Sequence, residues 1–187
     1  MAVGPYEGLH AFAFIRSAEP GTRVRDLVAA LRSKEDPERG PIFAASEVVG
    51  SYAGFVHLGA EDLGALQDVI AEELWGRGAH GEHAVEWRPV RTADGVFGPR
   101  RWAPRFVGLV RLWTEAGAAE DVLGRLPEAL GGPGGLFNGA SAVFGSFDIL
   151  LQMGSDEALS PVMDAVPGLV HRLEGVARTE TAFAILR

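Results

Sequence analysis

Short apolar stretches that alternate with polar residues are separated along the chain by longer stretches with a helical apolar period. At 9–16, Phe12 and Phe14 fall on one face of an extended segment, with small or branched apolar residues on the other. At 22–32, Val24, Leu27 and Leu31 form the apolar stripe of a helix. The same criteria predict strands at 9–16, 42–49, 53–59 and 83–88, and helices at 22–32 and 60–75. This β-α-β-β-α-β order is typical of a ferredoxin-like unit.

The second half of the chain repeats this order. It predicts strands at 105–112, within the hairpin 138–153 and at 176–186, and helices at 117–130 and 157–170. The stretch 140–153 (ASAVFGSFDILLQM) matches 45–58 (ASEVVGSYAGFVHL): in both, a Gly-Ser-aromatic turn joins two apolar runs. We expect Gly50 and Gly145 to supply a positive φ in these turns. The match predicts that the chain contains two copies of one structural unit.

These patterns predict an α+β fold made of two ferredoxin-like βαββαβ repeats. The first, degenerate repeat covers 1–88, a linker rich in Pro, Gly and Arg covers 89–104, and the second repeat covers 105–187. A four-stranded sheet with two helices on one face leaves its other face bare, and both faces of these strands are apolar. We therefore expect the two antiparallel sheets to pack face to face as an α+β barrel within one chain.

Composition narrows the class of protein. The chain has 187 residues, 47% of them hydrophobic and 22% charged, as is typical of a globular protein. It has no cysteine, which excludes disulfides and thiolate chemistry and fits a cytoplasmic location. The net charge of −8 argues against direct nucleic-acid binding. Neither a signal peptide nor an apolar segment of the ~20 residues that span a bilayer is visible, so we expect no membrane contact.

Three stretches of the second repeat resemble the effector-binding domain of Lrp/AsnC-type regulators. They are the turn of the hairpin, with Gly145 and Asp148 in an apolar-Gly-x-aromatic-Asp-apolar pattern, the helix after Asp156, and the ending 175–181 (GVARTET), which is similar to the family's Gly-Val-x-x-Thr-x-Thr. The resemblance covers about 105–187. In the first repeat, Ala53 stands where Asp148 stands in the second.

The resemblance implies the dimeric α+β barrel fold and the binding of an amino acid or a related small effector near the hairpin. Family members usually carry an N-terminal helix-turn-helix, whereas the first strand predicted here begins at about residue 9. We therefore expect a stand-alone small-molecule binding or regulatory protein without direct DNA binding. It would be a monomer or homodimer, with a partner protein as a further option.

The ligand-binding residues that the resemblance implies are Gly145, Ser146, Asp148, Thr179 and Thr181. The Asp148 carboxylate would take the ammonium group of the ligand, or alternatively satisfy amides of the turn. Ser146 is more typical of a turn than of a ligand contact. Thr179 and Thr181 share one face of a strand and could donate to a carboxylate, or serve only as β-branched strand residues.

The alternative function is a small enzyme of the barrel fold, monooxygenase-like or haem-handling. If His10 and His57 were neighbours on the inner face, they could perform acid–base work or ligate haem iron; otherwise each is a satisfied core histidine. This rests on analogy between folds. Outside that alternative we expect no cofactor. His80 and His83 lack the spacing of a zinc site, so we expect an exposed loop and no metal.

Two arginines occupy matching ends of the first strands of the two repeats. Arg16 and Arg111 could hold an anionic ligand at the barrel mouth or pair with acids such as Glu115, and we favour the ion pair. A third possible function is that of an assembly module whose sheet edges join chains.

Overall fold

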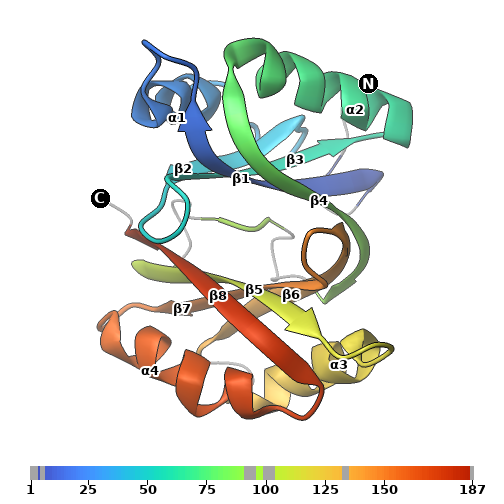
Figure 1. The fold of residues 1–187 in the computed structure, drawn as a ribbon, viewed down its shortest axis with the longest axis vertical. Helices are drawn as coiled ribbons and strands as arrows, with labels where there is room; N and C mark the ends of the chain where they lie inside the picture. Colours follow the sequence, from blue (N-terminus) through green and yellow to red (C-terminus); the bar gives the residue numbers. More distant parts are fainter. Residues whose placement is uncertain (1–3, 5–6, 91–95, 99–103, 132–134, 186–187) are drawn as a thin grey trace.

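The structure is a computed structural model that describes residues 4, 7–90, 96–98, 104–131 and 135–185. Helices and strands follow the order β-α-β-β-α-β twice (Figure 1). The first series is β1 (Leu9–Ala18), α1 (Val24–Arg32), β2 (Ile42–Glu47), β3 (Gly54–Ala60), α2 (Leu63–Glu73) and β4 (Ala79–Val90). The second is β5 (Phe106–Thr114), α3 (Ala119–Ala129), β6 (Phe137–Gly145), β7 (Ile149–Ser155), α4 (Ser160–Gly168) and β8 (Val176–Ile185). Short 3-10 turns, η1 (Trp75–Arg77) and η2 (Val170–Arg172), follow α2 and α4.

All predicted helices and strands are present, but several ends differ. Helix α2 begins after Asp62, whose carboxylate accepts a hydrogen bond from the Ala65 amide at 2.9 Å and so caps the helix. Helix α4 begins three residues later than predicted, because the Ser155 hydroxyl accepts from the amides of Glu157 and Ala158 and holds them in a turn. Strand β4 is twice as long as predicted, since it pairs with strands of both halves.

The eight strands form one antiparallel sheet in the order β2-β3-β1-β4-β6-β7-β5-β8. The two sheets expected to pack face to face are thus one sheet, made continuous by the pairing of β4 with β6. Just beyond β2, Val49 exchanges backbone hydrogen bonds of 2.7 and 2.8 Å with Phe183 of β8. This bridge joins the two ends of the sheet, so the sheet closes into a barrel.

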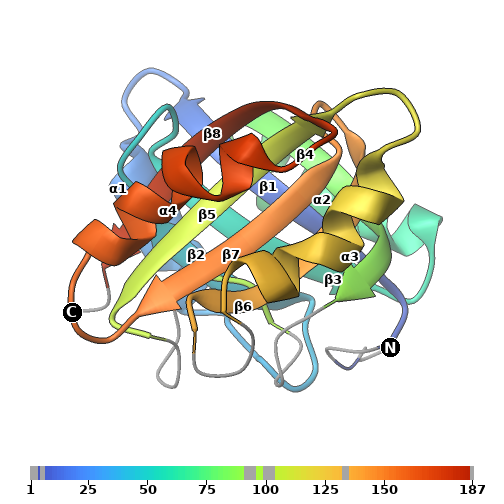
Figure 2. The same ribbon diagram turned by 90° about the horizontal axis from the view of Figure 1, so that it is seen from below.

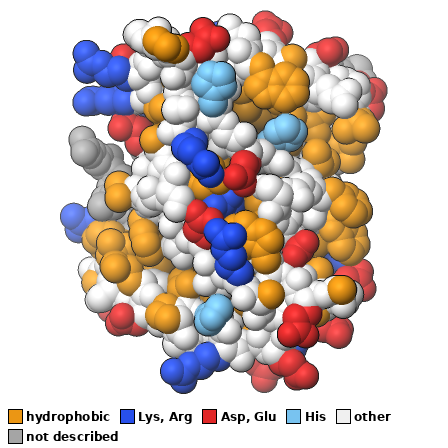
Figure 3. Space-filling model, viewed as in Figure 1, with side chains coloured by type: hydrophobic (Ala, Val, Ile, Leu, Met, Phe, Trp, Pro, Cys, Tyr) orange, Lys and Arg blue, Asp and Glu red, His pale blue; other side chains and the backbone are white. Residues whose placement is uncertain are grey.

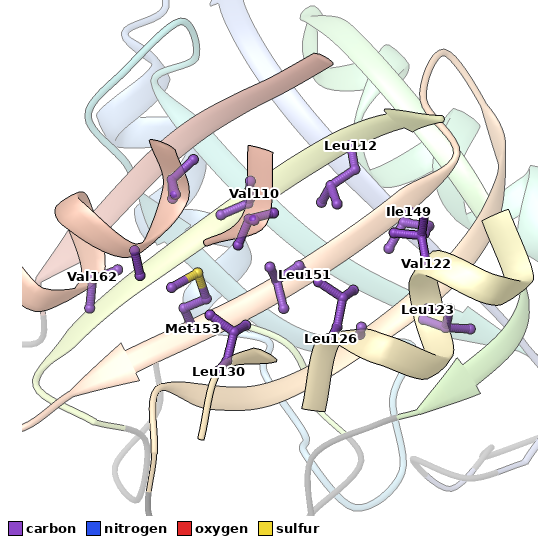
Figure 4. Close-up of a cluster of buried hydrophobic side chains, with 14 of the residues drawn as sticks. Val110, Leu112, Val122, Leu123, Leu126, Leu130, Ile149, Leu151, Met153 and Val162 are labelled. Atoms are coloured by element: carbon purple, nitrogen blue, oxygen red, sulfur yellow. The ribbon is translucent and has the colours of Figure 1, made fainter. Parts of the chain in front are cut away.

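Two layers of strands lie between two layers of helices. Helices α1 and α2 cover the outside of the first four strands, and α3 and α4 cover the outside of the last four (Figures 1 and 2). Each helix pair encloses a hydrophobic core against its own strands; in the second half Val110, Leu126 and Leu151 belong to it (Figure 4). A third core lies inside the barrel and draws side chains from both halves. Its largest fully buried side chains are those of five phenylalanines: Phe12, Phe14, Phe55, Phe97 and Phe147.

The predicted linker 89–104 is partly structural. Pro89 and Val90 still belong to β4, opposite Ser141 and Ala140 of β6. Residues 91–95 and 99–103 lie outside the described residues. Between them, the Phe97 side chain is fully buried in the core inside the barrel. A stretch expected to be polar and connecting therefore supplies a core residue.

The two turn glycines, Gly50 and Gly145, are required for different structural reasons. Gly50 has φ +151°, and a Cβ there would lie 2.7 Å from the carbonyl oxygen of Thr181. Gly145 does not have the positive φ that we predicted; it lies opposite Ala84, and a Cβ there would lie 2.6 Å from the Ala84 Cβ. Gly145 thus permits the close approach of β4 and β6. Among the described residues, no helix is long and apolar enough to cross a membrane.

Candidate functional site

Five polar side chains point into the barrel from five neighbouring strands. In the order of the sheet they are His57 on β3, His10 on β1, Glu86 on β4, Ser141 on β6 and Gln152 on β7. All five are buried, with exposed fractions of 6% or less. Burying a polar group costs free energy unless the group is hydrogen-bonded. Such a belt, with two histidines and a carboxyl group, is therefore a candidate site.

The two histidines form one directed chain of hydrogen bonds. The Phe97 amide donates to His57 Nδ1 at 3.0 Å, which places the His57 proton on Nε2. His57 Nε2 lies 2.8 Å from His10 Nδ1, so it donates there. His10 then carries its own proton on Nε2, which lies 2.9 Å from the Glu7 carbonyl oxygen. The hydrogen-bond partners thus assign both neutral tautomers.

Aromatic rings surround this pair. The His10 ring stacks on Phe43 with centroids 5.0 Å apart, and His57 lies 4.8 Å from Phe12 and 5.1 Å from Phe43. A hydrophobic core lies next to the pair inside the barrel. The two imidazoles are thus largely shielded from water.

The other polar groups of the belt have their own partners. The Ser141 hydroxyl donates to the Glu86 carboxylate, and the Gly98 amide donates to Gln152 Oε1 at 2.5 Å. Ala11 pairs with Val85, so one further step of that register brings His10 opposite Glu86. The members of the belt therefore lie on neighbouring strands from β3 to β6.

A second polar cluster lies at the other end of β1 and β5, around the buried Arg111. Its guanidinium donates to the Tyr52 hydroxyl at 2.8 Å and to Glu82 at 2.8 Å, and forms an ion pair with Glu180 at 2.6 Å. Arg16 donates to the same Tyr52 hydroxyl and to Glu82, at 3.1 and 3.3 Å. Figure 3 shows basic and acidic side chains gathered around a hollow in the middle of this face. The expected ion pair is present, although with Glu82 and Glu180 as partners.

The cluster shifts the pKa of two of its acids in opposite directions. Burial raises the pKa of the Tyr52 hydroxyl, and its hydrogen bond to Glu82 raises that pKa further, outweighing the two arginines. For Glu82, burial alone would raise the pKa, but hydrogen bonds from Ser146 and Tyr52 and the charge of Arg111 outweigh it, and the net pKa is lowered. The cluster thus favours a neutral Tyr52 beside an ionised Glu82.

The raised pKa of Tyr52 predicts that the protein loses stability at alkaline pH. Its folded-state pKa lies above the unfolded value of about 10, so the stability it contributes is complete below that pH and falls as the pH rises. Urea unfolding midpoints measured from about pH 9 to pH 11 should therefore fall less steeply for Tyr52→Phe than for the wild type. With only two tyrosines and one lysine in the chain, few other groups titrate there. Equal slopes for both proteins would contradict this assignment.

The residues implied by the family resemblance are not brought together in one pocket. Asp148 Oδ2 accepts from the amide and hydroxyl of Thr114, at 2.7 and 3.2 Å. Ser146 donates from its hydroxyl to Glu82 at 2.6 Å and so joins the Arg111 cluster. Thr179 and Thr181 are half-buried on β8 and alternate with Glu180 and Ala182, which face the barrel interior. Only Ser146 of this set therefore belongs to a site described here.

Other candidate features lie on the surface. His80 and His83 are exposed, on β4 rather than in a loop. No group of three or more possible metal ligands occurs in the described ranges. A pocket of about 400 Å³ lies outside the barrel between α3 and the start of β8, lined by Glu115, Asp121, Arg125 and Glu174 among others. Its side chains form no connected acid–base system comparable to the histidine pair.

Sequence reasoning identified His10, His57, Arg16 and Arg111 but did not identify the other residues of the two polar groups. Glu82 and Glu86 face inward because they alternate with Val85, on a strand predicted too short. Gln152 lies inside an apolar run, where a lone amide between leucine and methionine was the available signal. Phe97 could not be placed, because its segment carries no periodic pattern.

No protein-family model matches the sequence, and no curated protein matches it. Several solved structures share its fold. The siroheme decarboxylase NirDL aligns with a TM-score of 0.62 and 10% identity, covering 98% of this chain and 74% of that chain. An anthrone oxidase-like protein aligns with a TM-score of 0.54 and 10% identity, covering 100% of this chain and 95% of the other. A putative DyP-type peroxidase from Shewanella oneidensis gives 0.51 and 11%, with 98% and 95% covered.

At identities of 10 and 11% these likenesses show the fold alone. They agree with the closed sheet and the outer helices described above. The chain has the α+β barrel fold, with a buried histidine pair inside the barrel and a buried arginine at one mouth.

Proposed function

We propose that the protein is a small enzyme of the α+β barrel fold, in which the His10–His57 pair removes a proton from an organic substrate. One observation carries the proposal: the 2.8 Å hydrogen bond between the two imidazoles, inside the barrel and with both tautomers set by backbone partners. A core histidine needs one or two partners to be satisfied. A chain of two histidines that ends at the backbone of the exposed Glu7 is in addition a path for a proton.

The proton movement is balanced along this path. When a substrate takes the place of the Phe97 amide, its proton moves to His57 Nδ1. His57 Nε2 then gives its proton to His10 Nδ1, and His10 releases its own proton from Nε2 to bulk water beside the exposed Glu7. One proton enters and one leaves, and both imidazoles end as neutral molecules in the opposite tautomer. The substrate is left one proton poorer, as an enolate or phenolate.

The lining of the site supports an apolar, aromatic substrate. Among the described residues, the rings that contact the pair are phenylalanines, and the charged side chains inside the barrel are Glu86 of this belt and the Arg111 cluster. Structures named as an anthrone oxidase-like protein and as a putative monooxygenase from Fusobacterium nucleatum share the fold. These names support an enzyme more than a regulator.

Haem is the cofactor that the fold comparison suggests, because one neighbour is a siroheme decarboxylase in complex with an iron-uroporphyrin III analogue. The described residues do not fit it. Both nitrogens of His10 and of His57 are engaged by the hydrogen bonds above, and phenylalanine rings fill the barrel interior. An axial ligand needs a free imidazole nitrogen facing an open space, and with Phe97 and Gly98 in the places seen here neither histidine offers one. We derive no step through haem.

Titration with hemin checks this conclusion. Because hydrogen bonds engage both nitrogens of each imidazole and phenylalanine rings pack against them, we expect the Soret band of added hemin to be the same with the wild type and with a His10→Gln, His57→Gln double variant. A Soret shift that saturates at one hemin per chain and is lost in the double variant would instead support a haem-binding function.

The proposed function is tested by deuterium exchange. The wild-type protein is incubated in D2O with enolisable aromatic ketones, anthrone among them, and deuterium entering at the acidic carbon is followed by NMR. We expect exchange above the buffer rate, because removal and return of a proton at His57 exchanges it for deuterium. Absence of any catalysed exchange across the panel would count against the proposal.

Binding of an amino-acid effector stays a prediction. For Asp148, the hydrogen bonds from Thr114 favour the alternative of a carboxylate that satisfies its own chain. None of the solved structures named here is an Lrp/AsnC effector domain. The histidine pair has the stronger geometric support.

A further inference from the structure

We infer that Phe97 and Gly98 occupy the substrate site itself, and that this site takes an aromatic molecule with two neighbouring O–H or N–H donors. The inference rests on the proposed function, because it places the substrate at His57. It adds the class of ligand and the residues that recognise it.

The segment 96–98 contributes two successive backbone amides that donate hydrogen bonds to side chains of the polar belt. The Phe97 amide donates to His57 Nδ1 on β3 at 3.0 Å, and the Gly98 amide donates to Gln152 Oε1 on β7 at 2.5 Å. The two acceptors are 0% and 1% exposed and come from opposite halves of the chain. A connecting segment normally runs over the surface and satisfies its amides there or with water. Here the segment 96–98 lies inside the barrel, and buried side chains bind its ring and its amides as they would bind a ligand.

The aromatic ring of the segment is bound as well. The Phe97 side chain is fully buried, and its ring lies edge-on to Phe12 with centroids 5.0 Å apart. The following residue leaves no space beside it: a Cβ on Gly98 would lie 3.1 Å from Phe55 and 3.2 Å from Ala44. The segment thus presents one ring and two adjacent donors to a fitted space.

A molecule that displaces the segment must replace these interactions. A ligand without donors would leave His57 Nδ1 and Gln152 Oε1 buried and unsatisfied, which is strongly unfavourable. A ligand with donors but no ring would leave the space of the Phe97 side chain empty. The donor that reaches His57 Nδ1 is also the group whose proton the histidine pair can remove. Gln152 is accordingly a positioning residue for the second donor.

The inference is tested by the competition between the segment 96–98 and an added ligand for the same site. Catechol supplies a ring and two neighbouring O–H donors, and toluene supplies a ring without donors. Shortening Phe97 weakens the segment's hold and raises the fraction of open sites, which lowers the apparent Kd in proportion. We expect Phe97→Ala to bind catechol at least about tenfold more tightly than the wild type does, and more tightly than it binds toluene, by calorimetry under anaerobic conditions.

The matched control is Phe55→Ala, which removes a ring of the same size from the same hydrophobic layer but leaves the Phe97 side chain in place. It should show no preference for catechol over toluene. If Phe97→Ala does not fold, Phe97→Leu should show the same preference to a smaller extent. Equal behaviour of the Phe97 and Phe55 variants, or equal affinity for catechol and toluene, would overturn the inference.

The outcomes separate this inference from the proposed function, since binding under these conditions requires no proton removal. Tight catechol binding without any deuterium exchange would support the inferred ligand site and contradict the proposed enzymatic function. Exchange that depends on His57, together with indifference to catechol, would preserve the enzyme and reject this ligand class.

Discussion

Arg111→Ala is expected to lower the free energy of unfolding by about 3 kcal/mol, measured from urea unfolding curves at neutral pH. The Arg111 side chain is 3% exposed and forms ion pairs with Glu82 and Glu180, which are 33% and 20% exposed. Removing it leaves two carboxylates and the Tyr52 hydroxyl without their shared donor. The partial exposure of the carboxylates puts the loss at the low end of the range for a broken buried pair, about 3–5 kcal/mol.

The matched control is Arg178→Ala. Arg178 also pairs with Glu180, at 3.2 Å, but its side chain is 63% exposed. Exposed ion pairs contribute only about 0–1 kcal/mol, so this variant should remain close to the wild type. Equal losses in the two variants would show that burial does not determine the contribution of Arg111. High salt should reduce the small effect at Arg178 more than the effect at Arg111.

His57→Gln is expected to reduce the rate of substrate deuterium exchange by roughly 10²–10⁴-fold, the contribution usual for a general base. Glutamine keeps hydrogen-bonding groups near Phe97 and His10 but offers no nitrogen that accepts a proton at neutral pH. The far-ultraviolet circular dichroism and melting temperature are measured alongside, to show that the variant is folded.

His10→Gln should cause a smaller loss, because His57 keeps its base nitrogen and loses only the exit for its proton. His80→Gln, an exposed histidine at the far part of β4, is the control and should match the wild type. Unchanged exchange in His57→Gln would contradict the proposed role.

Local patterns along the sequence determined the helices and strands and their order. Alternation at 9–16 assigned Phe12 and Phe14 to one face, and both lie in the core inside the barrel. The bare apolar faces of two half-sheets required a partner, and the barrel satisfies this requirement. Matching positions likewise placed Arg16 and Arg111 in one mouth, where both contact Tyr52. These predictions succeed because the alternation of apolar and polar residues that determines which side chains are buried can be recognised within a short stretch of sequence.

The tertiary structure alone decided which of those inward residues meet. His10 and His57 are 47 residues apart and meet through the register of β1 with β3, in which His10 is level with Gly59 and the two rings extend toward each other. Glu82 reaches Arg111 and Gln152 reaches Gly98 only because the sheet closes across both halves. The insertion of Phe97 depends on two buried acceptors 40 and 54 residues from their donors. Such contacts depend on strand register and closure, which are set by the packing of the whole chain and leave no periodic trace in it.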